Sequence, residues 1–121
     1  MRSFIFLLLF SNSCFAKEII LDRTNNMGIR KIDLLKETKG IYLFNGKSLG
    51  NRLPPKVEAS WQAVERGPKL QKRKARCFAG TYIYINKTSG SEYRRQGCAE
   101  GPGYGSLVQS LEEIRRHAKG R

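Results

Sequence analysis

Clustered cations beside tyrosines are the residues of this sequence best suited to bind a partner. Residues 69–76 hold five basic side chains, and the hairpin-like segment that follows adds two more; together they are Lys69, Lys72, Arg73, Lys74, Arg76, Arg94 and Arg95. Tyr82 and Tyr84 lie two positions apart in the sequence between these two groups of cations. Lys and Arg bind phosphate with release of counterions, and aromatic rings beside them stack on exposed bases. The pattern predicts a polyanion-binding surface made of these nine residues; a solvated basic face with tyrosines that only pack in strands is the alternative.

The C-terminal segment adds further cations and the single histidine. Its basic residues are expected on the same side as residues 69–76, as a basic tail that frays; they are Arg115, Arg116, Lys119 and Arg121. His117 is a candidate general base with Glu112 or Glu113 as partner, which would suit a small ribonuclease. Catalytic groups need fixed positions, however, and His117 also fits a helix C-terminus, where the dipole favours a cation. We therefore favour a protein that is not an enzyme, and keep catalysis by His117 and Glu113 as an alternative.

Two of the three cysteines are placed to form a disulfide. Cys77 and Cys98 flank a segment predicted as a β-hairpin, so they fall near each other at its open end. In an oxidising compartment such a pair is joined. Two cysteines and one histidine are too few for a closed zinc site, so neither a metal nor another cofactor is expected.

The first sixteen residues have the three parts of a secretory signal. Arg2 supplies a positive charge, residues 4–10 are apolar without a break, and Cys14 and Ala16 are small residues two apart. Cleavage is predicted between Ala16 and Lys17. The apolar run is shorter than the roughly 20 residues of a spanning helix, so no membrane span is expected in the mature chain. Acylation of Cys14, which would tether the product to a membrane, is the alternative.

The whole chain is strongly basic, with a formal net charge of +13 over 121 residues. Residues 17–121 keep nearly all of this charge and are long enough for one small domain. Such a charge attracts anionic lipid headgroups, acidic polymers, acidic proteins and nucleic acid, without choosing among them. Export argues against a genomic target.

The elements that position these residues follow from apolar periodicity and turn residues. Strands are expected at 18–23, 41–44, 77–86 and 92–97, and helices at 29–39, 54–67 and from 106 onward. Ser106 with Gln109 forms a capping box, and the glycine-rich segment 101–105 is expected to be a plain loop. Phe78 is expected on one face of its strand with Tyr82 and Tyr84. The fold class is α+β, in the order β-α-β-α-β-β-α: a small single domain with a disulfide-stapled β-hairpin and two or three short helices.

Together these features predict an exported small basic binding or accessory protein, periplasmic or secreted, of the bacterial envelope. Its partner is an anionic envelope component, an acidic protein or nucleic acid, bound through residues 69–76 and the 77–98 hairpin. Two alternatives stay open: a secreted toxin or killing factor, including a small ribonuclease that uses His117, and an inhibitor of another exported protein. The sequence does not indicate an oligomeric state.

Overall fold

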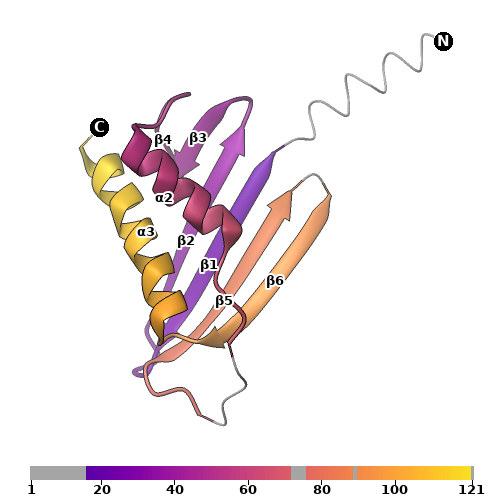
Figure 1. Ribbon diagram of the computed structural model, residues 1–121, viewed down its shortest axis with the longest axis vertical. Helices are drawn as coiled ribbons and strands as arrows, with labels where there is room; N and C mark the ends of the chain where they lie inside the picture. Colours follow the sequence, from indigo (N-terminus) through magenta and orange to yellow (C-terminus); the bar gives the residue numbers. More distant parts are fainter. Residues whose placement is uncertain (1–15, 72–75, 89, 121) are drawn as a thin grey trace, which may run out of the picture.

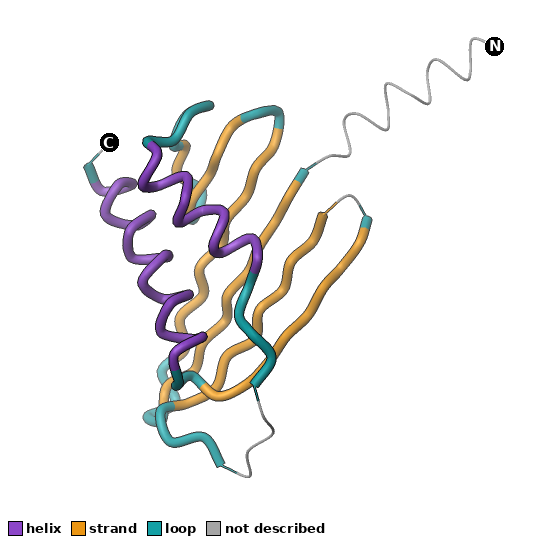
Figure 2. The backbone as a smooth tube through the Cα atoms, viewed as in Figure 1, coloured by secondary structure: helices purple, strands orange, loops and turns teal. Residues whose placement is uncertain are grey.

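The computed structural model describes residues 16–71, 76–88 and 90–120, and in this part six antiparallel strands form one sheet with two helices on one face (Figure 1, Figure 2). The strands are β1 (Lys17–Asn25), β2 (Arg30–Thr38), β3 (Ile41–Phe44), β4 (Lys47–Ser48), β5 (Gly80–Thr88) and β6 (Ser91–Cys98), and the helices are α2 (Pro55–Arg66) and α3 (Pro102–Lys119). The strand order across the sheet is β4-β3-β2-β1-β5-β6. The mixed α and β composition is confirmed, but the fold is richer in strands than expected.

The core lies between the two helices and the sheet face that they cover. Alternate strand residues and one stripe of each helix supply it: Ile19, Leu21, Leu35, Phe44, Tyr82 and Tyr84 from the sheet, Val57, Trp61 and Val64 from α2, and Leu107, Leu111 and Ile114 from α3. These are the periodicities of two and of about 3.6 residues that strands and helices require. The helix predicted at 54–67 is confirmed, including its buried face.

The segment predicted as a helix at 29–39 is strand β2 instead, so that prediction was wrong. Its apolar spacing fits a helix, but the residues before it form a tight turn. The side-chain oxygen of Asn25 accepts hydrogen bonds from the backbone N–H groups of Met27 and Ile29, both at 2.9 Å. Gly28 has a φ of +81°, which glycine adopts without strain. The turn sends the chain back along β1, and pairing with β1 outweighs the helical periodicity.

Helix α3 begins earlier than predicted and does not fray at its end. It starts at Pro102 and not at Ser106, so the expected capping box does not form. Proline suits the first helical position, because its missing N–H would have no partner there. The first helical hydrogen bond runs from the N–H of Gly105 to the oxygen of Gly101, at 3.0 Å. At the other end, Ala118 is buried against the core and holds the last turn.

The hairpin of β5 and β6 is confirmed, but β5 begins at Gly80 and not at Cys77. Ahead of β5, the Glu100 carboxylate accepts hydrogen bonds from the backbone N–H groups of Phe78 (2.8 Å) and Ala79 (3.1 Å). These bonds replace those of a neighbouring strand and turn the chain aside. Phe78 is therefore exposed while Tyr82 and Tyr84 are buried, so the prediction that the three share one strand face was wrong.

Gly80 allows β5 to start against the end of β1. Its φ is +115°, and a Cβ at this position would overlap the backbone oxygen of Thr24. We expect Gly80→Ala to lower the free energy of unfolding by about 2 kcal/mol, because the backbone is strained and the strand must shift. Gly90→Ala is the matched control: its φ is +84°, but the space around it is open, so the expected loss is about 1 kcal/mol. Urea denaturation measures both, and equal losses would contradict a specific contact at Gly80.

A buried cluster of charges joins α3 to the sheet. Asp33 on β2 is 1% exposed. Its Oδ2 accepts hydrogen bonds from the guanidinium groups of Arg23 (3.0 Å) and Arg115 (2.8 Å), and its Oδ1 accepts one from the side-chain amide of Asn45 (3.1 Å). The Arg115 guanidinium also lies over the ring of Phe44, 5.3 Å from its centre. Arg115 is therefore a fixed structural residue and not part of a frayed tail.

Candidate functional site

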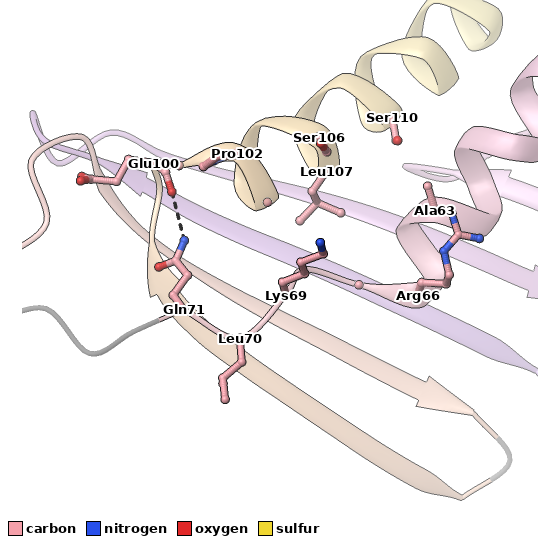
Figure 3. A pocket seen from close by; sticks show the side chains of 13 residues that line it. Ala63, Arg66, Lys69, Leu70, Gln71, Glu100, Pro102, Ser106, Leu107 and Ser110 are labelled. Carbon is pink, nitrogen blue, oxygen red and sulfur yellow. Dashed lines mark hydrogen bonds between the residues drawn. The ribbon is translucent and has the colours of Figure 1, made fainter.

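The side chain of Gln71 pairs with the edge strand β6 much as another strand would. Its Nε2 donates to the backbone oxygens of Cys98 (2.9 Å) and Glu100 (3.0 Å), and its Oε1 accepts from the Cys98 N–H (2.8 Å); Figure 3 shows the bond to Glu100. Gly97 leaves the necessary room, since a Cβ there would lie 2.5 Å from Oε1. These bonds hold the start of the basic segment at the end of β6.

The predicted disulfide between Cys77 and Cys98 is present, with Cα atoms 5.1 Å apart. Cys98 is also the residue to which Gln71 is bonded. Gln71, within the basic run, and Cys77, directly after it, are thus both attached to one residue of β6. Three predicted binding residues of that run, Lys72, Arg73 and Lys74, lie outside the described residues.

The other predicted cations are distributed around this anchor point. Lys69 and Arg76 are exposed and form no ion pair with any residue that the structure describes. Arg94 and Arg95 project from opposite faces of β6, because neighbouring strand residues alternate. Arg94 is exposed, whereas Arg95 is half-buried with its guanidinium 5.0 Å from the ring centre of Tyr93, to whose hydroxyl it also donates. The hairpin cations therefore do not form one patch.

Tyr82 and Tyr84 are core residues, so their predicted part in binding is wrong. They are 1% and 0% exposed, and a buried ring cannot stack on a base. The Tyr84 hydroxyl donates to the backbone oxygen of Val64 at 2.5 Å. Burial raises the pKa of Tyr84 to about 12. Tyr93 is instead the partly exposed tyrosine of this hairpin.

The last turns of α3, which carry the described C-terminal cations, lie at the other end of the molecule from residues 69–71 (Figure 1). Arg115 belongs to the buried cluster, and Arg116 forms an ion pair with Glu113 at 2.6 Å. Lys119 is exposed in the last turn of α3, and Arg121 lies outside the described residues. A single basic side that includes the C-terminal segment is therefore not formed, because α3 runs away from the basic segment.

The candidate catalytic pair His117 and Glu113 is not assembled as an acid and a base. The Glu113 carboxylate is occupied by Lys56 at 3.4 Å and by Arg116 at 2.6 Å. The Nε2 of His117 is buried and has no hydrogen-bond partner among the described residues. A general base needs an orienting partner, and Glu113 is paired with Lys56 and Arg116 instead.

A groove of about 660 Å³ lies beside Gln71, between the end of α2 and the start of α3 (Figure 3). Ala63 and Leu107 give it an apolar wall, and Arg66 and Lys69 add cations. The glycine-rich segment 101–105, expected as a plain loop, instead forms the first turn of α3 along the groove. The volume is in the range of small-molecule sites, and cations beside an apolar wall suit an amphiphilic anion.

Sequence reasoning missed Arg66 and Gln71 as parts of this region. Arg66 and Lys69 flank Gly67-Pro68, and this placement of two cations around a helix end was a usable signal. Gln71 offered no comparable signal, because an amide in a charged run is ordinarily solvated. Its role depends on contacts with Cys98 and Glu100, which follow Gln71 by 27 and 29 positions in the chain.

No family model matches the chain, and no curated protein and no solved structure is significantly similar to it. Neither described helix is long and apolar enough to cross a membrane. The function of the chain is therefore inferred from the geometry of the site.

Proposed function

We propose that this chain is an exported small basic binding or accessory protein of the bacterial periplasm or envelope, which holds an anionic partner through residues 69–76 and the 77–98 hairpin. One observation carries the proposal: Gln71 and Cys77, which bracket four of the five cations of residues 69–76, are both attached to Cys98. A loop whose ends are fixed loses less conformational entropy on binding than a free segment does.

The charges around the anchor support an anionic partner. Lys69 and Arg76 are exposed without an ion pair in the described part of the chain, so their charges are available to a ligand. The net charge of +13 adds a long-range attraction that speeds association with any polyanion. Export is supported by the disulfide, since such bonds persist in oxidising compartments.

Removing the charges of the basic run tests the proposal. We expect the variant Lys72→Gln, Arg73→Gln, Lys74→Gln to lose about tenfold or more of its affinity for the polyanion that the wild type binds, because fewer counterions are released. The dependence of the affinity on salt should weaken as well. Binding is measured on the oxidised chain with heparin, RNA, lipopolysaccharide and phosphatidylglycerol vesicles at several salt concentrations.

A control with equal charge loss separates position from total charge. Arg52, Lys87 and Lys119 are exposed. The loop before α2, the end of β5 and the last turn of α3, which carry them, lie at the end of the molecule opposite residues 69–71 (Figure 1). Changing all three to Gln should cost at most half of the binding free energy that the first variant loses. Equal losses in the two variants would contradict a site at residues 69–76. Absence of binding to every one of the four probes would overturn the proposed function itself.

A further inference from the structure

Exposed apolar side chains gather at one end of the molecule. In the described residues six large hydrophobic side chains are exposed: Leu70, Met27, Phe78, Ile29, Ile32 and Tyr93. All but Tyr93 belong to the turn between β1 and β2, the start of β2, or the chain just before residue 71 and just after residue 77. Leu70, Met27 and Phe78 are 80%, 79% and 71% exposed, so these side chains bury little of their apolar surface in the fold. Because five of these six side chains lie at one end, we take that end as a candidate interaction surface.

The pairing of the strands shows that these residues come from neighbouring loops. Asn25, at the end of β1, lies opposite Gly80, at the start of β5. The turn that carries Met27 therefore lies next to the chain that leads from Phe78 into β5. Gln71, one residue after Leu70, is bonded to Cys98 at the same end of the sheet. Figure 1 shows these segments together at the end opposite the C-terminus.

Cations surround this apolar end. Lys31, Lys69 and Arg76 are exposed and have no ion pair in the part of the chain that the structure describes. Arg30 also lies here, but Asp22 neutralises it at 2.6 Å. Each cation near an anionic lipid surface strengthens binding by about fivefold.

We propose that this end docks on an anionic phospholipid bilayer, with Met27, Ile29, Leu70 and Phe78 inserted at the level of the headgroups and Lys31, Lys69 and Arg76 against lipid phosphates. The proposal rests on the proposed function and names its partner. Met27 and Ile29 lie on the turn between β1 and β2, whereas Leu70 and Phe78 lie on two other loop segments, so the apolar side chains do not come from one flat strand or helix face. A fluid interface accepts separate insertions of this kind, whereas a protein partner would need a matching pocket for each.

The test changes apolar area and leaves charge unchanged. We expect Leu70→Ser with Phe78→Ser, in the oxidised chain, to lower the partition coefficient on phosphatidylglycerol–phosphatidylcholine vesicles by about tenfold or more. Affinity for heparin, which offers charge without an apolar interior, should stay within about twofold. Wild-type binding should be weak on pure phosphatidylcholine vesicles and should fall between about 0.1 M and about 1 M salt, over which the screening length shrinks from about 10 Å to about 3 Å.

Tyr93→Ser is the matched control, because Tyr93 is the exposed large hydrophobic residue outside this end. It should leave the partition coefficient within about twofold of the wild type, with folding of each variant checked by circular dichroism. Vesicle binding that survives the Leu70 and Phe78 changes would overturn the lipid inference. Binding to heparin or RNA without binding to vesicles would also overturn it and leave the proposed function standing, whereas loss of all binding would remove both.

Discussion

Asp33→Ala is expected to lower the free energy of unfolding by about 3 to 5 kcal/mol, enough to unfold a small domain. The carboxylate is almost fully buried and is shared by the guanidinium groups of Arg23 and Arg115. Without it, two largely buried cations face each other, and Glu112, which lies 3.2 Å from the Nε of Arg115, is the remaining counter-charge among the described residues. The Nε of Arg23 already has no hydrogen-bond partner among the described residues, so Asp33 is the main partner of that side chain. Urea or thermal denaturation measures the loss.

Arg116→Ala is the control for this effect. Arg116 also forms an ion pair, with Glu113, but its side chain is 71% exposed. Exposed pairs contribute about 0 to 1 kcal/mol, so little change is expected. Replacing Asp33, Arg23 and Arg115 together by leucine or methionine should recover part of the stability that Asp33→Ala loses. Equal stability of Asp33→Ala and Arg116→Ala would contradict the buried cluster as an anchor of α3.

Removing the disulfide, by Cys77→Ala with Cys98→Ala, is expected to lower the free energy of unfolding by about 3 kcal/mol. The bond closes a loop between residues 21 positions apart, and opening it restores entropy to the unfolded chain. The same change frees one side of the basic run, while the Gln71 bonds to the backbone of residue 98 persist. Affinity for the anionic partner should therefore fall, although no charge is lost.

Chemical reduction of the wild type provides the control, because it opens the same bond without a substitution. The reduced wild type and the double variant should show the same midpoint in urea and the same affinity. An unchanged affinity after reduction, with the fold retained, would contradict a role for the closed loop in binding.

Local signals in the sequence predicted the elements whose turns and caps are built from neighbouring residues. Asn45 and Gly46 form the turn between β3 and β4, both with positive φ. Pro55 opens α2, and Gly67 ends it. The prediction at 29–39 failed because apolar spacing over a short window fits both a helix and a strand. Pairing with β1 decided the outcome, and such pairing is invisible in a local window.

The charges and the disulfide of the candidate site were predictable from the sequence, whereas the burial of individual side chains and their partners was not. The pairing of Cys77 with Cys98 follows from cysteine count and spacing. The burial of Tyr82 and Tyr84 depends on which sheet face the helices cover, and strand alternation alone leaves this open. Asp33 accepts a hydrogen bond from Arg115, which follows it by 82 positions in the chain, and only folding brings the two together.

The position of β1 in the sheet has a consequence for how the chain assembles. β1 is the first strand in sequence, yet it lies between β2 and β5 and is paired with both. β1 to β4 are joined in order by short turns, as are β5 and β6, so we expect these two pieces to form early from local contacts. The union of the pieces waits for β1 to meet β5, which follows it by more than fifty residues. We therefore expect the pairing of β1 with β5, which closes this long loop, to be the slow step that joins the meander of β1 to β4 with the hairpin of β5 and β6.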